Sequence, residues 1–134
     1  MTLQVQLVSP ERILWSGEAE MVTARTIDGG DISFLTGHAP FVGALETARV
    51  TIRPDQGADT TFAVHGGFVE VSGNSVSLLS DVSEAADVVD VQRAEAARQA
   101  ARDALAKDPN DADAAAALRR AEVRLDVAGA SPAA

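Results

Sequence analysis

The stretch "FVEVSGNSVSLLS", residues 68–80, sets the structural character of the first part of the chain. It contains two short apolar runs, residues 68–71 and 75–79, which are joined at Gly73-Asn74. Glycine and asparagine tolerate the positive φ angles of tight hairpin turns, so this pair between two alternating runs predicts a β-hairpin. We therefore expect antiparallel β-structure around this stretch.

The same alternation of apolar and polar residues recurs toward the N-terminus. In "LQVQLVS", residues 3–9, Leu3, Val5 and Leu7 would face one side of a strand and the two glutamines the other. Gly66-Gly67 lies inside a strand-like run, which indicates a β-bulge or a close approach of two backbones. Further strands are predicted at residues 13–15, 18–27, 31–35, 48–55 and 60–67. Many short strands separated by turn residues favour an antiparallel β-sandwich or barrel.

The composition changes near residue 84, and the remainder of the chain predicts helices. Residues 85–134 hold nineteen alanines, with apolar residues spaced by three and four. Asp87 or Asp90 is expected to cap a first helix that ends near Lys107. The run 108–111, "DPND", would end this helix and cap a second one, so the two helices would lie antiparallel. The expected fold is α+β, with a β-sandwich domain at 1–84 and a helical hairpin at 85–134.

Composition and charge exclude several classes of function. The 134 residues include no cysteine, which rules out a disulfide framework, a thiolate zinc site and a cysteine nucleophile. The formal net charge of −9 argues against nucleic acid or an anionic membrane surface as the main partner. No apolar run approaches the roughly 18 residues of a membrane span, and no signal peptide is apparent. We expect a cytoplasmic protein, or one held at a membrane by a protein partner.

The two histidines, His38 and His65, are the natural candidates for catalysis or metal binding. A nucleophilic triad needs a serine on a strained turn, and no G-x-S-x-G elbow occurs in the chain. A metal site formed by His38, His65 and Asp31 stays open as one hypothesis, although the histidines lack helical i, i+4 spacing. The simpler interpretation is that each histidine satisfies neighbouring backbone groups.

The predicted helices carry a group of charged residues that could meet at one end of the hairpin. With the turn centred near Pro109, Arg93 and Arg124 would lie at about the same level of an antiparallel pair. Asp90 and Arg120 are close to them in the helical sequence. Converging guanidinium groups suit phosphate oxygens, because their planar donor forks chelate them. The alternative is a solvated face of ion pairs, and spacing alone favours that alternative.

Four stretches in order resemble the epsilon subunit of F-type ATP synthases, which is called delta in mitochondria. Residues 28–45, "DGGDISFLTGHAPFVGAL", and residues 64–81, "VHGGFVEVSGNSVSLLSD", are similar to two signatures of that family. Residues 89–94, "VDVQRA", and residues 119–125, "RRAEVRL", resemble the motifs that open and close its helical part. The resemblance covers nearly the whole chain.

The resemblance implies a ten-stranded β-sandwich followed by a two-helix hairpin, in a rotor subunit that does no chemistry. Such a subunit binds gamma and the c-ring through the sandwich and couples ring rotation to the catalytic alpha/beta head. Its hairpin modulates ATP hydrolysis through that head. The implied location is the cytoplasmic face of the bacterial plasma membrane, as a peripheral subunit without direct membrane insertion.

The resemblance also implies roles for particular residues, and it implies no catalytic or metal site. ATP would be a regulatory ligand, and no other cofactor is implied. One arginine of the ATP-binding members is replaced here by Ala100. A free-standing nucleotide-binding module that uses the helical arginines is the alternative function. The expected contacts are Asp28, Gly29, Gly30 and Asp31 with the c-ring; His38, Ala39, Pro40 and Phe41 with gamma; and Asp90, Arg93, Ala94, Arg120 and Arg124 with ATP.

Overall fold

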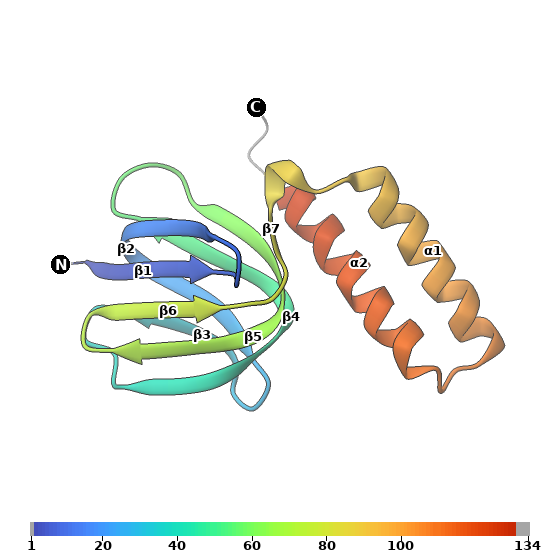
Figure 1. Ribbon diagram of the computed structural model, residues 1–134, viewed down its shortest axis with the longest axis horizontal. Helices are drawn as coiled ribbons and strands as arrows, with labels where there is room; N and C mark the ends of the chain where they lie inside the picture. Colours follow the sequence, from blue (N-terminus) through green and yellow to red (C-terminus); the bar gives the residue numbers. More distant parts are fainter. Residues whose placement is uncertain (1, 131–134) are drawn as a thin grey trace.

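A computed structural model describes residues 2–130 of the chain, which form a β-sandwich followed by a helical hairpin (Figure 1). The predicted α+β organisation is confirmed in this respect. The elements are β1 (Leu3–Val8), β2 (Ile13–Thr26), β3 (Gly30–Leu35), β4 (Phe41–Pro54), β5 (Thr60–Ser72), β6 (Ser75–Leu79), β7 (Ser83–Ala85), the single-turn 3-10 helix η1 (Ala86–Val88), α1 (Val91–Lys107) and α2 (Ala112–Ala130).

The sheet closes on itself through the first strand. The strand order is β1-β6-β5-β4-β2-β3, and β1 also pairs with β2, so five strands form a closed path. β3 extends this path beside β2, and β7 pairs with β5. β1 and β6 run parallel, with Val5 opposite Val76. The expectation of a wholly antiparallel sandwich is therefore wrong at this pair, which joins two strands far apart in the sequence.

The sheet has seven strands rather than about ten, because three of its strands are long and bent. β2 and β4 have 14 residues each, and β5 has 13. The first half of β2 pairs with β1, and its second half pairs with β3 and β4. The register between β2 and β4 shifts twice along the way. The predicted strands 13–15 and 18–27 are both parts of β2, and the predicted strands 60–67 and 68–71 are both parts of β5. The breaks in the sequence pattern therefore lie within continuous strands.

The Gly66-Gly67 pair lies inside β5, and glycine is required there. Gly66 and Gly67 have positive φ angles of 84° and 127°. A Cβ atom at Gly67 would lie only 2.0 Å from the carbonyl oxygen of Leu79. No side chain fits in that space, so the predicted close approach of two backbones is confirmed.

The core lies inside the β-sandwich, on the faces that the alternation predicts. Leu3, Val5 and Leu7 are at most 1% exposed, and Phe34 is fully buried. Ile32 is only partly buried, but it packs against the core. The buried cluster consists of Leu3, Val5, Leu7, Ala19, Val22, Ala24, Phe34, Leu45, Val50, Ile52, Phe62, Val64, Val69, Val71, Val76 and Leu78.

Both helices begin at aspartates that cap them. The backbone N–H of Arg93 donates to Asp90 Oδ1 at 3.1 Å, so Asp90 rather than Asp87 caps α1. The N–H of Ala114 donates to Asp111 Oδ1 at 3.0 Å at the start of α2. These contacts satisfy N–H groups that lack a partner in the first turn of a helix.

The hairpin is packed through small side chains. Alanines are buried on both helices, together with one valine on α2. These residues are Ala94, Ala101, Ala114, Ala121 and Val127. The small side chains let the helix axes approach closely but bury little apolar area.

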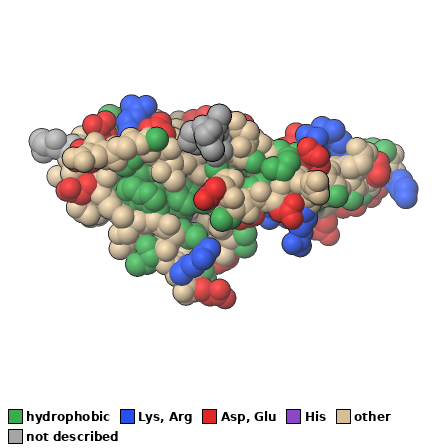
Figure 2. Space-filling view, turned by 90° about the horizontal axis from the view of Figure 1, so that it is seen from above, with side chains coloured by type: hydrophobic (Ala, Val, Ile, Leu, Met, Phe, Trp, Pro, Cys, Tyr) green, Lys and Arg blue, Asp and Glu red, His purple; other side chains and the backbone are tan. Residues whose placement is uncertain are grey.

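α2 is the helix that contacts the sheet, against β4 and β5, and α1 lies on its outer side (Figure 1). The hairpin therefore projects from the sandwich, with acidic and basic side chains interspersed along it (Figure 2). The predicted boundary at residue 84 falls inside β7 (Ser83–Ala85). No helix within residues 2–130 has the length and apolar character needed to cross a membrane.

Candidate functional site

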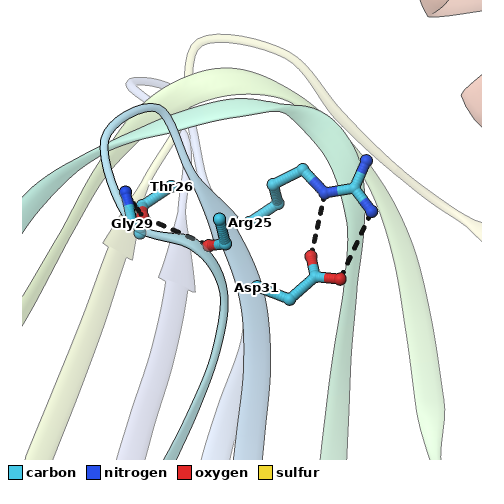
Figure 3. Close-up of polar contacts among 5 residues, drawn as sticks. Arg25, Thr26, Gly29 and Asp31 are labelled. Carbon is cyan, nitrogen blue, oxygen red and sulfur yellow. Dashed lines mark hydrogen bonds and ion pairs between the residues drawn. The ribbon is translucent and has the colours of Figure 1, made fainter.

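The turn between β2 and β3 carries the residues predicted to face the c-ring, and its conformation is fixed by Thr26. The Thr26 side chain is enclosed, with the residue only 2% exposed. Its hydroxyl accepts a hydrogen bond from the Gly29 N–H at 2.9 Å and donates one to the Gly30 carbonyl at 3.2 Å. Gly30 has a φ of 68°. The turn thus presents Asp28 and Gly29 to solvent. Figure 3 shows the hydrogen bond between Thr26 and Gly29 that holds its backbone.

Asp31 lies at the start of β3, where it forms an ion pair across the strands. Arg25 Nε donates to Asp31 Oδ1 at 2.8 Å, and a second nitrogen donates to Oδ2 at 3.3 Å (Figure 3). The two residues are direct partners in the register of β2 and β3. The hydrogen bond from Arg25 lowers the pKa of the Asp31 carboxyl and raises that of the guanidinium. The Asp31 carboxylate is therefore already paired with Arg25 of the same chain.

A cleft of about 700 Å³ separates this face of the sheet from α2. Arg25 and Asp31 line its sheet side, and Arg119 and Glu122 line its helix side. One ion pair joins the two sides: Arg49 donates to Asp126 Oδ1 at 2.8 Å. The mixture of charges gives the cleft no preference for a ligand of one sign.

His38 belongs to the turn at the other end of β3, where it covers the edge of the core. Its backbone N–H donates to the Leu35 carbonyl at 3.1 Å, and its Nδ1–H donates to the Ala39 carbonyl at 2.7 Å. Its ring lies edge-on to Phe34, with the centroids 4.9 Å apart. The ring centroids of Phe34 and Phe41 are 5.6 Å apart. His38 is thus a packing and turn residue in this chain.

An apolar row crosses the outer surface of the sandwich. Register pairs connect Ala44 to Phe68, Phe68 to Leu79, Leu79 to Val8 and Val8 to Ile13, so the row spans five strands. Phe68 is 58% exposed, and Val42, two residues before Ala44, is 71% exposed. We call these six residues the apolar strip. It consists of Val8, Ile13, Val42, Ala44, Phe68 and Leu79.

The apolar strip was missed in the sequence, although the sequence contains a signal for it. Two apolar pairs occur within predicted strands and a third at the start of β4, and successive side chains of a strand point to opposite faces. One member of each pair must therefore face outward when the other joins the core. The pairs are Phe41-Val42, Phe68-Val69 and Leu78-Leu79.

The three residues of the metal hypothesis do not come together. His38 packs on Phe34, Asp31 pairs with Arg25, and His65 lies beside Glu84. Within residues 2–130, no group of three histidine or acidic side chains is placed to hold a metal ion. The hypothesis of a metal-dependent enzyme therefore loses its geometric basis.

Most of the predicted helical cluster does come together at the open end of the hairpin. Asp90, Arg93, Ala94 and Arg124 line a cavity of about 420 Å³, next to Glu84. Arg120 is not among its lining residues. The cavity's cationic groups are those of Arg93 and Arg124, and its anionic groups are those of Glu84 and Asp90, which also caps α1.

Glu84 is the residue of this region that sequence reasoning missed. Arg124 Nε donates to Glu84 Oε1 at 2.5 Å, and His65 Nε2 lies 3.2 Å from the same oxygen. Burial acts to raise the pKa of Glu84, but the hydrogen bond and charge of Arg124 outweigh it and lower the pKa. Nothing local in the sequence indicates this contact, because its partners are 40 and 19 residues away.

Residues 2–86 match the family described as ATP synthase, Delta/Epsilon chain, beta-sandwich domain. The chain belongs to this family. Its similarity to named epsilon chains extends beyond the sandwich. It is 48% identical to the ATP synthase epsilon chain of Streptomyces griseus over 123 residues, which cover 92% of both chains. It is 40% identical to that of Bacillus pumilus over 131 residues, which cover 96% of this chain and 98% of the other.

Solved structures of ATP synthases share the fold of this delta/epsilon family member. A chain of the Euglena gracilis mitochondrial ATP synthase, in an OSCP/F1/c-ring structure, superimposes with a TM-score of 0.72 at 19% identity. That match covers 96% of this chain and 78% of the other. A chain from the Tetrahymena thermophila central stalk and c-ring gives a TM-score of 0.55 at 17% identity and covers 67% and 71%. At these identities the likeness concerns the fold alone.

Proposed function

We propose that the chain is the epsilon subunit in the central stalk of a proton-translocating F-type ATP synthase. It is a non-catalytic rotor component that couples c-ring rotation to the catalytic head. The observation that carries this proposal is the 48% identity to an epsilon chain over 92% of both sequences. The subunit would act at the cytoplasmic face of the bacterial plasma membrane, held there by its protein partners.

The apolar strip supports a protein contact on the sandwich, and we assign it to gamma. The residues already predicted to touch gamma, His38 to Phe41, lead directly into Val42 of the strip. An exposed apolar row across five strands marks a protein interface rather than ordinary surface. The backbone that carries it is held by a closed sheet, so little backbone entropy would be lost on docking.

The strip can be tested by measuring binding of the full chain to purified gamma. Phe68→Glu places a charge at the centre of the strip and should reduce binding by at least about tenfold, because a charge would be buried without a partner. Asp28→Asn, at the turn assigned to the ring, is the control and should bind gamma normally. Equal binding by Phe68→Glu and the wild type would overturn this assignment.

The β2–β3 turn supports a contact with the polar loops of the c-ring. Its backbone is fixed through Thr26, and Asp28 forms no ion pair within residues 2–130, unlike Asp31. Of the two carboxylates, Asp28 is therefore the one whose charge is available to a basic partner. Assembly of the Asp28→Asn and Asp31→Asn variants onto the ring tests this, and the larger defect is expected for Asp28→Asn.

We further propose that the hairpin modulates ATP hydrolysis and that ATP is its regulatory ligand. The cavity at the open end of the hairpin offers the guanidinium groups of Arg93 and Arg124, which suit phosphate oxygens. Since Arg124 is paired with Glu84, a phosphate would have to displace that carboxylate. ATP should therefore bind weakly.

Titration of the isolated chain with ATP tests the nucleotide proposal. Saturable binding that is lost in Arg93→Ala and kept in Arg102→Ala, whose side chain does not line the cavity, would support it. Absence of binding at millimolar ATP would overturn it.

Deletion of residues 86–134 tests the hairpin's role in the whole enzyme. Every residue of the sandwich's buried core precedes that segment, so assembly should persist while the rate of ATP hydrolysis changes.

A further inference from the structure

We propose that His65, Glu84 and Arg124 form a proton-sensitive contact that holds α2 on the β-sandwich and loosens when the solution is acidified. We call these three residues the His65 cluster. The proposal goes beyond the function above, because it concerns how the hairpin is attached within a single chain. It can be tested without gamma, the c-ring or nucleotide.

The His65 cluster joins three elements through one carboxylate. Glu84 on β7 accepts from His65 on β5 at 3.2 Å and from Arg124 on α2 at 2.5 Å. The sheet and the hairpin are therefore linked by a charged oxygen that both sides share. Anything that changes the charge of the histidine changes the link to the helix.

Burial makes protonation of the His65 imidazole unfavourable. Its side chain is 3% exposed, and those of Glu84 and Arg124 are about one quarter exposed. Because a carboxylate only accepts hydrogen bonds, Nε2 carries the proton of the neutral imidazole. Nδ1 is buried and has no hydrogen-bond partner within the described residues. A second proton would therefore sit on Nδ1 without an acceptor, which is costly in a buried site.

The charges around His65 come from two elements. Burial is the main cause that lowers its pKa below the usual 6.5, and the charges of Arg124 and Arg120 on α2 lower it further. Glu84 on β7 acts in the opposite direction but does not prevail. On β4 the residue paired with His65 is the uncharged Thr47. Both arginines belong to the hairpin, so docking of α2 is itself one cause of the lowered pKa.

The lowered pKa of His65 in the docked form decides how docking of α2 changes with pH. When α2 leaves the sandwich, the imidazole becomes exposed and recovers a pKa near its usual value, so the undocked form takes up a proton first. Docking is therefore strongest above about pH 6.5 and weakens as the pH falls below that value. In the window between the two pKa values, the docking equilibrium falls by up to about tenfold per pH unit. A separate ion pair, Arg49–Asp126, also joins α2 to the sheet, and His65 takes no part in it.

The matched experiment uses the chain's two histidines in the full-length protein. His65→Gln keeps an amide that donates to Glu84 but cannot titrate, and His38→Gln removes the other imidazole. Amide hydrogen exchange of α2, corrected for its intrinsic pH dependence, reports docking. From about pH 7 to about pH 5.5, protection should fall by up to about eightfold in the wild type and in His38→Gln. It should stay constant in His65→Gln, and Ile52 in the core should stay protected throughout.

Three outcomes would overturn the proposal. The first is constant protection of α2 in the wild type, and the second is an unchanged fall in His65→Gln. The third is simultaneous loss of protection at Ile52, which would mean that the whole chain unfolds. Should His65→Gln fail to fold, an NMR titration of the wild type decides the question. The signals of α2 residues must shift with the imidazole of His65 and not with that of His38, and independent behaviour would sink the idea.

Discussion

The β-sandwich and the helical hairpin are held together by different means. The sandwich buries leucine, isoleucine, valine and phenylalanine side chains, each of which contributes about 1.5–3 kcal/mol when fully enclosed. The hairpin buries mainly alanines, which offer about one methyl group each, and Val127 is its only larger side chain buried within the described residues. Ion pairs, Arg49–Asp126 and Arg124–Glu84, fasten it to the sheet. The sandwich is therefore stabilised mainly by apolar burial, and the attachment of the hairpin depends more on ion pairs and small contacts.

The largest expected effect comes from the sandwich core. Phe34→Ala removes a fully buried ring that contacts His38 and Phe41, and it should lower the free energy of unfolding by about 3–5 kcal/mol. Denaturant titration measures this loss. Phe68→Ala, at a side chain exposed on the outer surface, should change the unfolding free energy by less than about 0.5 kcal/mol. Similar losses in the two variants would contradict our description of the core.

The next effect should separate the hairpin from the sandwich. Ala121 is fully buried, and Ala121→Leu would overpack this site at a cost of about 1–3 kcal/mol. Hydrogen exchange should accelerate in α2 while the core strands stay protected. Ala116→Leu, at an exposed position of the same helix, is the matched control and should leave exchange unchanged. If the strands lose protection together with α2, the two parts form one cooperative unit.

A smaller effect is expected at the start of α1. Asp90→Ala removes the cap that accepts from the Arg93 N–H and should destabilise the helix by about 1 kcal/mol. Exchange of the first-turn amides measures this loss. Asp87→Ala changes the charge by the same amount three residues earlier, in η1, and should have little effect on the same amides. An equal effect of both variants would mean that charge rather than capping matters.

The smallest effect should come from the exposed Arg49–Asp126 pair. Both side chains are about half exposed, so a double-mutant cycle between Arg49→Ala and Asp126→Ala should give a coupling of about 0.2–1 kcal/mol. Added salt should reduce the coupling, because water and ions screen the pair. A coupling well above this range would show that the hairpin is attached more firmly than its alanine packing suggests.

Much of the fold is local in the sequence, and those parts are predictable. Alternation identified the buried faces of the strands, such as that of Leu3, Val5 and Leu7, because each strand buries one side. The run 108–111 predicted the hairpin turn, and Gly66-Gly67 predicted a bulge or a close backbone approach, of which Gly67 shows the second. The ten strands implied by the resemblance exceed the seven observed. The alternation also divided β2 and β5 into two strands each, because breaks in the pattern within a long strand look the same as strand ends.

The parts that could not be predicted depend on contacts between distant residues. Glu84 meets Arg124 across 40 positions, and β1 meets β6 in parallel, with no local pattern that indicates either pairing. Asp31 was predicted to face the c-ring, but its ion pair with Arg25 follows from the strand register, which the sequence leaves undefined. The gamma, c-ring and ATP contacts remain predictions of the resemblance.

The parallel pairing of β1 with β6 has a consequence for how the chain folds. Val5 reaches its partner Val76 only after the intervening strands have been made, so closing the sheet requires contacts of long sequence separation. Such contacts slow folding, whereas the hairpin is built from neighbouring segments and can form quickly. On the ribosome, closure must wait until β6 has emerged. β1 can pair with β2 as soon as both have been made, so the late step is the closure between β1 and β6 rather than the placement of β1 itself.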